Sequence, residues 1–387
     1  MNLKVGIVGL PNAGKSTLFN ALLKKQVAEA ANYPFTTIEP NIGVVPVPDK
    51  RLETLATLVE REEHVKPPLT HATVQFVDIA GLVKGASEGE GLGNKFLSHI
   101  REVDLVVNVI RYFDDPSVVH VAGDVNPERD RGIIETELIL ADLQTIVRQK
   151  DNGKRQKDGS ALPPELLERL FQILNNGKPA SSLEFPPEEQ KAVRDLQLLT
   201  MKPVLYVANV SEQQLTTDSV VPASALASLR RSGPGSSEKK DWIPGQARND
   251  MDGRNDILGI SAKVETELAS LSEDEQKAYL KELGLEASGL DRLIAKAYEM
   301  LGLISFLTCG PIEARAWTIT RGMKAPQAAG VIHTDFEKKF IKADVVAYTD
   351  LVALKGWKGA REAGKVRSEG KEYVMQDGDV VEFKVGN

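Results

Sequence analysis

The stretch Gly9-Leu10-Pro11-Asn12-Ala13-Gly14-Lys15-Ser16-Thr17 decides the fold. It follows the apolar run 3–8 and precedes the helix-like run 18–23. The pattern G-x-x-x-x-G-K-[ST] therefore lies between a strand and a helix, as its chemistry requires. A chance glycine turn would not explain the full pattern together with these flanks. The stretch predicts a P-loop, in which backbone N–H groups at a helix start surround phosphate oxygens.

The residues of this loop have separate expected roles. Glycine permits backbone conformations that are strained for other residues, so N–H groups can turn toward the phosphates. Lys15 supplies a positive charge to the β- and γ-phosphates, and we expect it to be catalytic. Ser16 is an expected ligand of Mg²⁺, a cation that prefers oxygen and shares its coordination with substrate phosphates. The residues expected to hold the phosphates are Asn12, Ala13, Gly14, Lys15, Ser16 and Thr17.

The composition is that of an ordinary soluble protein. The chain has 387 residues, 42% hydrophobic and 27% charged, which suggests two or three domains. It contains no apolar run of the roughly 20 residues that a membrane span needs, so we expect a cytoplasmic protein with no membrane partner. The net charge of −7 argues against nucleic-acid binding over the whole surface, but leaves room for a local basic face. The single cysteine, Cys309, excludes a disulfide framework and a cysteine-based metal site.

A polar loop bounded by prolines follows the first helix, at residues 32–41. In a P-loop NTPase, a loop here supplies a threonine that reaches Mg²⁺ and the γ-phosphate in the triphosphate state. Thr37 is the predicted ligand and Thr36 is the second choice. The alternative is a structural loop that leads into the strand 42–45.

A second strand, 74–77, ends at the motif Asp78-Ile79-Ala80-Gly81. Asp78 can hold Mg²⁺ through water, and the Gly81 N–H can meet the γ-phosphate, which gives Gly81 a catalytic role. The next residue is Leu82, where Ras-like enzymes have the glutamine that orients the attacking water. Leucine cannot hydrogen-bond water, so hydrolysis needs another group to position it.

Two histidines are candidates for that task. His99 lies in an apolar helical stretch and is expected to be packed rather than catalytic. His120 follows a third strand, 105–110, and an acidic loop. Histidine in such a place is more often structural, although it is the usual general base near pH 7.

The strand 203–208 ends at Asn209, where a GTPase would show N-K-x-D. Here Val210 replaces the lysine and Glu212 the aspartate. The longer carboxylate of Glu212 moves the acceptor that guanine needs, so adenine becomes a candidate base. After another short apolar run, 260–263 resembles the base-flanking S-A-K loop. The residues expected at the base are Asn209, Val210, Glu212, Ser261 and Ala262.

The rest of the chain suggests separate parts. We predict a helix over 133–147, a charged turn at 150–155 and further helices. They form a helical insertion, interpreted as an antiparallel hairpin, that serves as scaffold or docks a partner. Segment 355–361 is basic and contains Trp357, so it is a candidate RNA contact or a solvated loop. The predicted domains are a nucleotide-binding domain at 1–131 and 201–303, a helical insertion at 132–200, a disordered insertion at 216–256 with a docking motif at 242–244 as the alternative, and a β-rich domain at 304–387.

Taken together, the P-loop, the loop 33–41, the motif 77–86 and Asn209-x-x-Glu212 resemble the YchF-type Obg-related ATPases. The likeness covers nearly the whole chain. It implies an α/β fold of the P-loop NTPase G-domain type, with an inserted helical hairpin and a C-terminal β-grasp-like TGS domain. Segment 216–256 is not expected from the helix and strand spacing of the family. It bears on the local fold after Glu212 and on the shape of the base pocket.

The resemblance also implies a function. Members are slow Mg²⁺-dependent ATPases that bind GTP more weakly, which Asn209 and Glu212 match. They have a hydrophobic residue at the position of Leu82 and a histidine, matched by His120, considered catalytic. Asn12 matches an asparagine that holds K⁺ in related enzymes. Family members associate with the ribosome, for which the large subunit is a candidate, and act in translation or stress responses; TGS-like domains are often tied to RNA.

Two alternatives remain open at this point. One is a GTPase that acts in ribosome assembly, which nucleotide competition would distinguish. The other is a nucleotide-binding ribosome or RNA adaptor whose hydrolysis is incidental. For an adaptor, Lys15→Ala should abolish hydrolysis and leave ribosome association intact.

Overall fold

The computed structural model describes residues 3–29, 41–79, 93–118, 120, 123–153, 162–216 and 257–386. Packing divides the chain into two compact units. Unit 1 consists of Met1–Leu3, Leu22–Phe76 and Leu290–Asn387, and unit 2 of Lys4–Ala21 and Val77–Gly289. These units are defined by packing and do not test the predicted domain bounds, which stay a prediction.

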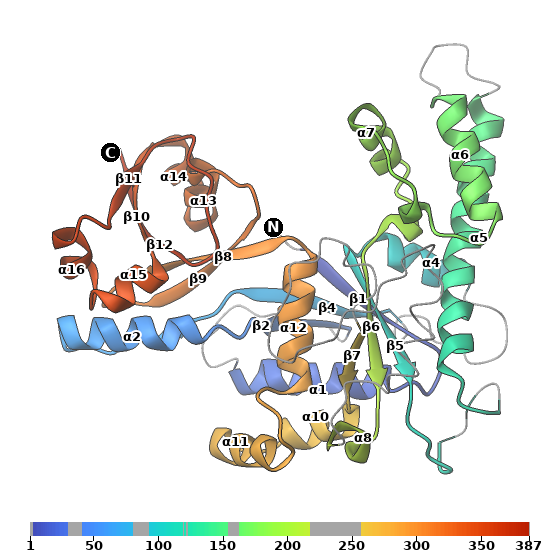
Figure 1. Cartoon of the computed structure of the whole chain (residues 1–387), viewed down its shortest axis with the longest axis horizontal. Coiled ribbons are helices and arrows are strands. Elements are labelled where there is room, and N and C mark those ends of the chain that lie inside the picture. Colours follow the sequence, from blue (N-terminus) through green and yellow to red (C-terminus); the bar gives the residue numbers. More distant parts are fainter. Residues whose placement is uncertain are drawn as a thin grey trace, which may run out of the picture. The chain divides into compact units, whose positions relative to one another are not determined.

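The elements follow one another along the chain as Figure 1 shows. The strands are β1 (Lys4–Val8), β2 (Ile42–Pro46), β3 (Leu69–Thr70), β4 (Thr73–Asp78), β5 (Leu105–Arg111), β6 (Val204–Asn209), β7 (Ile257–Ile260), β8 (Leu303–Cys309), β9 (Ala314–Thr320), β10 (Phe340–Ala347), β11 (Arg367–Glu369) and β12 (Asp379–Val385). The helices are α1 (Lys15–Glu29), α2 (Lys50–Glu63), α4 (Asn94–Arg101), α5 (Pro127–Gly153), α6 (Pro164–Asn175), α7 (Pro187–Asp195), α8 (Glu212–Thr216), α10 (Ala262–Leu268), α11 (Glu273–Glu282), α12 (Gly289–Met300), α13 (Ala325–Ile332), α14 (Thr334–Lys338), α15 (Tyr348–Ala353) and α16 (Trp357–Glu362), with short 3₁₀ turns at Ala180–Ser182 and Leu199–Met201. Within the described residues, no helix is both long enough and apolar enough to cross a bilayer.

Unit 2 is built on parallel strands in the order β1, β5, β6 and β7. Every residue of β5 is buried, as expected for a parallel strand covered on both faces. The register pairs Arg111 with Asn209, and Asn209 with Ile260. The carboxyl ends of β5, β6 and β7 therefore meet at one edge, which is where ligands bind to such sheets.

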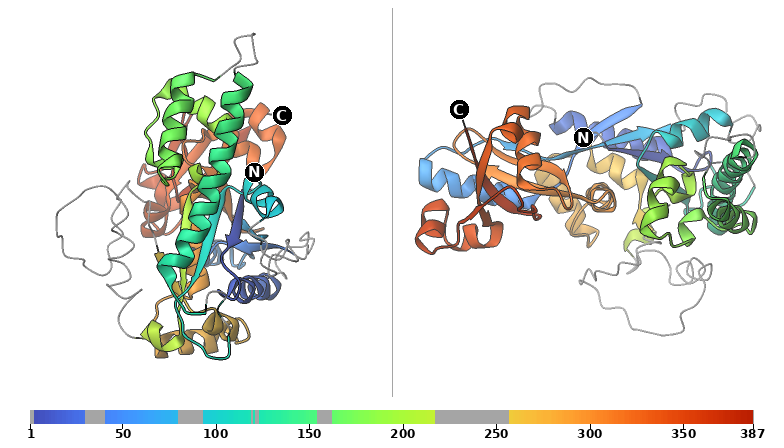
Figure 2. Two further views of the ribbon diagram at one scale, coloured as in Figure 1. Left: turned by 90° about the vertical axis from the view of Figure 1, so that its right-hand side faces the viewer. Right: turned by 90° about the horizontal axis from the view of Figure 1, so that it is seen from above.

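A helical region rises from the strands of unit 2, with α5 and α6 side by side (Figures 1 and 2). The predicted helix 133–147 was too short, because α5 begins at Pro127 and continues to Gly153. The Asn126 side chain accepts from the Arg129 N–H at 3.1 Å and caps the helix start. At the other end, Lys150 stays helical and its ammonium donates to Glu168 of α6 at 2.6 Å. The predicted charged turn is therefore wrong at residues 150–153.

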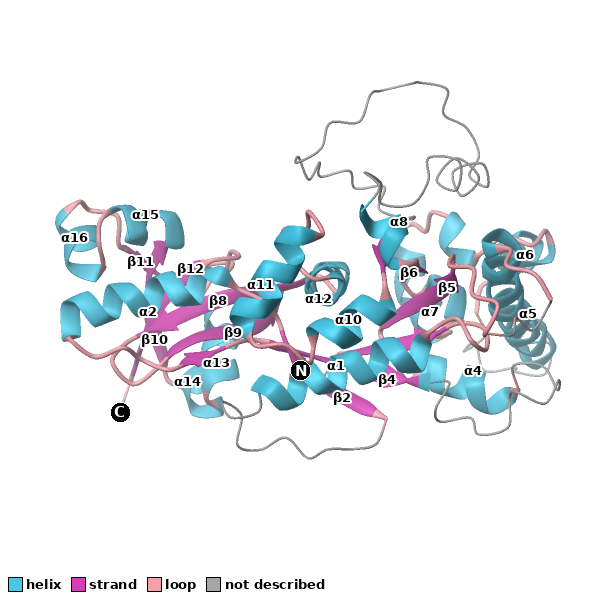
Figure 3. Ribbon diagram, turned by 90° about the horizontal axis from the view of Figure 1, so that it is seen from below, coloured by secondary structure: helices cyan, strands magenta, loops and turns pink. Residues whose placement is uncertain are grey.

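Unit 1 contains a mixed sheet with the strand order β11-β10-β12-β8-β9-β3. β10 is antiparallel to β11 and β12, β8 is antiparallel to β9, and β12 is parallel to β8. Figure 3 shows α13 against these strands, and Ala325, Ala328 and Ala329 of this helix pack into their core with Phe306 and Val345. Strand β3 was not predicted from the sequence; it pairs in parallel with β9 at the edge of the sheet.

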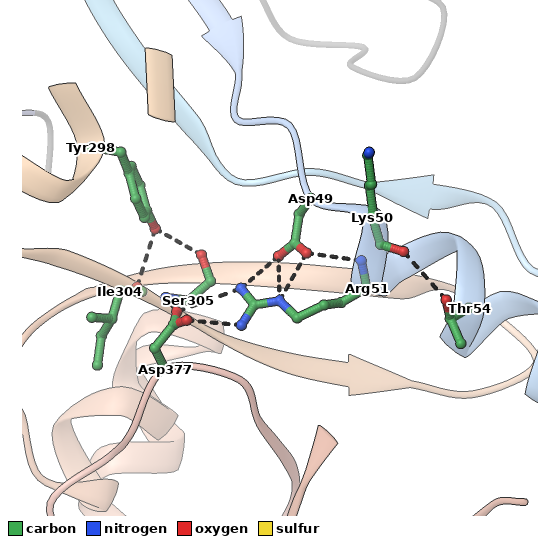
Figure 4. A network of polar contacts seen from close by, with 8 residues as sticks. All are labelled: Asp49, Lys50, Arg51, Thr54, Tyr298, Ile304, Ser305 and Asp377. Atoms are coloured by element: carbon green, nitrogen blue, oxygen red, sulfur yellow. Dashed lines mark hydrogen bonds and ion pairs between the residues drawn. The ribbon is translucent and has the colours of Figure 1, made fainter. Parts of the chain in front are cut away.

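Helix α2 is joined to the same sheet by a polar network, seen in Figure 4. The Arg51 guanidinium donates to Asp49 at the start of α2, at 2.8 Å, and to Asp377 at 2.9 Å. Asp377 also accepts from the Ser305 N–H at 2.9 Å, and the Ser305 hydroxyl lies 2.9 Å from the hydroxyl of Tyr298. One planar guanidinium can satisfy two carboxylates in this way, which a lysine could not.

Candidate nucleotide site

The P-loop has the backbone that its glycines require. Gly9 and Gly14 have φ angles of 151° and 95°, and Asn12 is left-handed at 61°. A Cβ on Gly9 would lie 2.4 Å from the carbonyl oxygen of Val109. A Cβ on Gly14 would lie 2.1 Å from Nδ2 of Asn209. Both positions exclude any larger residue, so the loop is closed at one side by β5 and at the other by Asn209.

Lys15 is held inside this loop. Its side chain is buried, and Nζ donates to the Leu10 carbonyl oxygen at 2.6 Å. Burial lowers the pKa of Lys15 to about 8, and the buried Asp78 carboxylate opposes that shift. An anionic ligand would favour the charged form of this desolvated ammonium and raise its pKa again. The geometry fits the predicted phosphate contact.

The oxygen donors near Lys15 suit a small hard cation. Ser16 and Thr17 are exposed at the start of α1, whereas Asp78 is buried at the end of β4. Among the described residues no group of three acidic, histidine or cysteine side chains could hold a metal alone. The hydroxyl of Ser16 and the carboxylate of Asp78 fit Mg²⁺ that shares its coordination with a nucleotide. The other predicted residues here, Thr37 and Gly81, lie outside the described residues.

Asn209 joins the two ends of the site. Its Nδ2 donates to the carbonyl oxygen of Ala13 at 2.9 Å, and its Oδ1 accepts from the N–H of Ala262 at 3.0 Å. The side chain is 4% exposed. A single buried carboxamide therefore connects the P-loop with the loop after β7, as Figure 1 places the ends of β6 and β7 side by side.

The remaining base-end residues surround this carboxamide. Val210 is buried, packs near Tyr112 and Ile257, and donates its N–H to Ile260 at 2.9 Å. Ser261 and Ala262 are buried at the start of α10. Val210, Ser261 and Ala262 are each at most 5% exposed, so their side chains pack around Asn209.

Glu212 is half-buried and begins α8. It lies by the hydroxyl of Tyr279, which donates to Glu267 at 3.1 Å. Desolvation and the two carboxylates raise the pKa of Tyr279 to about 12. A protonated tyrosine hydroxyl beside Glu212 limits the directions that this carboxylate can adopt.

His120 is buried and paired. Its Nε2 lies 2.8 Å from Oδ2 of Asp130 in α5, and both side chains are 5% exposed. Arg129 donates to the other oxygen of Asp130 at 3.3 Å and to Asp124 at 2.6 Å. A carboxylate that holds a histidine ring fixes its tautomer and orientation. This arrangement suits a base or a structural histidine, so a catalytic role stays a prediction. His99 is half-buried in α4, on a helix separate from that pair.

Sequence reasoning missed Arg111 and Asp130. Arg111 is the last residue of β5 and is 2% exposed. A charged residue that ends a largely apolar strand was a usable signal, because a buried charge needs several partners. Asp130 had no such signal, since an acidic residue in a first helical turn is ordinary.

Comparison with known proteins identifies the relatives of this chain. Residues 4–156 match a family model described as a 50S ribosome-binding GTPase, and residues 303–386 match the C-terminal model of the YchF GTPases, described as of unknown function. The ribosome-binding ATPase YchF of Bacillus subtilis is 48% identical over 388 residues, with 99% of each chain covered. The chain belongs to the YchF family.

Other YchF proteins agree with this placement. The ribosome-binding ATPase YchF of Escherichia coli O157:H7 is 45% identical, with 99% of each chain covered. The solved structure of the YchF GTPase of Schizosaccharomyces pombe is 37% identical, has a TM-score of 0.84 and covers 99% of this chain and 98% of that one. The predicted YchF resemblance and α/β P-loop fold are confirmed.

Proposed function

We propose that this protein is a slow Mg²⁺-dependent ATPase that works as a nucleotide-controlled switch. The observation that carries the proposal is the buried Asn209, which joins the P-loop at Ala13 to the loop at Ala262. Next to it stand Val210 and Glu212 in place of the lysine and aspartate that read guanine. The curated YchF relatives are named ATPases, which supports the same choice.

Each catalytic group has a proposed task. Lys15 and the P-loop amides hold the β- and γ-phosphates, and Gly81 meets the γ-phosphate. Mg²⁺, when bound, neutralises phosphate charge; Ser16, Thr37 and Asp78 would hold it. Because Leu82 cannot orient water, His120 is the group proposed to position the attacking water.

The deciding experiment is equilibrium binding of non-hydrolysable ATP and GTP analogues with Mg²⁺. We expect the intact chain to prefer ATP by at least about tenfold, the value of one well-placed hydrogen bond. The double variant Val210→Lys with Glu212→Asp should move the preference toward GTP. The matched control Glu282→Asp makes the same shortening on an exposed position of α11 and should leave the preference unchanged.

A preference of the intact chain for GTP would replace this proposal with a ribosome-assembly GTPase. The family model that matches residues 4–156 is described as a 50S ribosome-binding GTPase, so the test is needed.

We also propose that the protein binds the ribosome, with the large subunit as the first candidate, and acts in the cytoplasm on translation or a stress response. The curated relatives are named ribosome-binding ATPases. Co-sedimentation with ribosomes and with separated subunits, in ATP analogue and in ADP, should show association in one nucleotide state. Equal absence of association in both states would refute this part.

The proposed RNA contact lies in the C-terminal sheet region of unit 1. Lys355 and Lys358 are exposed on either side of Trp357, and the Arg361 guanidinium lies 5.4 Å from the centre of the Trp357 ring. Cations and an aromatic ring together suit a nucleic-acid backbone and base. The variant Lys355→Glu with Lys358→Glu should weaken ribosome association and leave ATP binding unchanged.

Asn12 is proposed to hold K⁺ beside the phosphates. Its left-handed backbone places it at the exposed tip of the P-loop. Turnover should be faster in K⁺ than in Na⁺, and equal turnover in the two salts would remove this proposal.

A further inference from the structure

Arg111 is a buried arginine that makes its hydrogen bonds to a loop rather than to an acid. Its Nε donates to the carbonyl oxygen of Phe113 at 3.1 Å, Nη1 to Val118 at 2.9 Å and Nη2 to Asp115 at 3.2 Å. The guanidinium also lies 4.5 Å from the centre of the Phe113 ring. Three carbonyl oxygens spread over six residues thus accept from one planar guanidinium. Arginine suits this arrangement because its donors are spread over a rigid plane.

This loop, residues 113–118, has a fixed shape. The Asp115 carboxylate accepts from the N–H and hydroxyl of Ser117, at 2.9 and 2.6 Å. The N–H of Val118 donates to the Asp115 carbonyl oxygen at 3.1 Å. These bonds close a turn whose carbonyls point inward to Arg111, so the loop depends on that side chain.

The loop lies at the base end of the nucleotide site. Arg111 is paired in register with Asn209, and the N–H of Tyr112 donates to the Asn209 carbonyl oxygen at 2.9 Å. Gln214 of α8 donates to the Tyr112 carbonyl oxygen at 3.4 Å.

We propose that Arg111 is a positioning residue for base recognition: it holds loop 113–118 next to Asn209, and the loop completes the pocket that receives the base. This inference rests on the nucleotide site proposed above. Arg111 touches no phosphate-binding residue in this arrangement of bonds. Its loss should therefore affect the base and spare the phosphates.

The test compares ATP with inorganic tripolyphosphate, a ligand with the phosphates and no base, both with Mg²⁺. Arg111→Lys keeps the charge but cannot reach three separated carbonyls. We expect the dissociation constant for ATP to rise about tenfold, and that for tripolyphosphate to stay within about twofold. A merely structural arginine would weaken both ligands together.

Two further variants keep the test decisive. Asp115→Ala opens the turn at Ser117 without touching a buried group, and should weaken ATP binding about threefold with tripolyphosphate unchanged. It carries the test if Arg111→Lys does not fold. The control Arg169→Lys alters an exposed arginine of α6 that pairs with Glu189 of α7, and it should change the affinity for neither ligand.

Equal weakening of ATP and tripolyphosphate in both loop variants, or no change in either ligand, would overturn the role of Arg111. Failure of the intact chain to bind ATP at all would instead refute the proposed nucleotide site. The first result would come from the loop variants and the second from the intact chain, so the same experiment distinguishes them.

Discussion

The phosphate end and the base end of the candidate site are built in opposite ways. The phosphate end lies in one stretch, residues 9–17, with Asp78 beside it. The base end is gathered from the ends of three strands: Arg111 on β5, Asn209 on β6 and Ser261 after β7. The first is a local backbone shape, and the second exists only after the strands pair.

This difference predicts different sensitivities. A local loop fails when one of its own residues changes, because each group meets the ligand directly. The base end loses function when a residue that holds its segments together is changed. Asn209 is such a residue, because it connects two segments that are distant in sequence. Variants of the two ends can therefore be distinguished by whether they weaken the binding of ATP alone or of both ATP and tripolyphosphate.

The largest effect is expected at the phosphate end, from Lys15→Ala. Loss of one cationic donor to the transferred phosphate should lower ATP turnover by about 100-fold or more. ATP and tripolyphosphate should be weakened together, because Lys15 contacts no base. Steady-state hydrolysis and binding measure this, with Lys24→Ala on the exposed side of the same helix as the control. Ribosome association that survives in Lys15→Ala, together with normal cellular function, would favour the adaptor alternative.

The second effect is expected where the two ends join, from Asn209→Ala. It leaves the Ala13 carbonyl and the Ala262 N–H without their buried partner. Urea denaturation should show a loss of about 2–4 kcal/mol, and both ATP and tripolyphosphate should bind more weakly. The near-isosteric Asn209→Asp loses the donor and places a buried carboxylate against the Ala13 carbonyl oxygen, so it should destabilise the fold at least as much as Asn209→Ala. Unchanged stability in Asn209→Ala would mean that the two ends are held independently.

The smallest effect is a pH dependence confined to the phosphate end. With a pKa of about 8, unliganded Lys15 loses its proton as the pH rises above 8, whereas bound phosphate favours the charged form. ATP affinity should be constant below this range and fall by up to about tenfold per pH unit above it, with proton uptake on binding. Calorimetry in buffers of different ionisation enthalpy measures that uptake. The ratio of ATP affinity to GTP affinity should not change with pH, because the Asn209 carboxamide does not titrate. If this ratio changes with pH in the same way as the ATP affinity, the phosphate end and the base end do not act separately.

The fold was predictable where the sequence carries local periodicity. The strands 74–77, 105–110 and 203–208 were expected, and each is present. The end of α5 was misjudged because Lys150 and the residues after it look like a turn in isolation, yet Glu168 of the next helix pairs with Lys150. β3 was missed because two residues are too few to show the alternating pattern of a strand. They form a strand only because they pair with β9.

By itself, the sequence determined the P-loop, the strand that precedes it and the substitution of Val210 and Glu212 at the base motif. These depend on backbone preferences and residue identity within a few positions. The tertiary structure decided that Asn209 meets Ala13 across 196 residues, that Asp130 holds His120 and that Arg111 folds the loop beside the base. The physical reason is that such contacts follow from strand order and register, which bring distant residues together and leave no pattern in any short window of sequence.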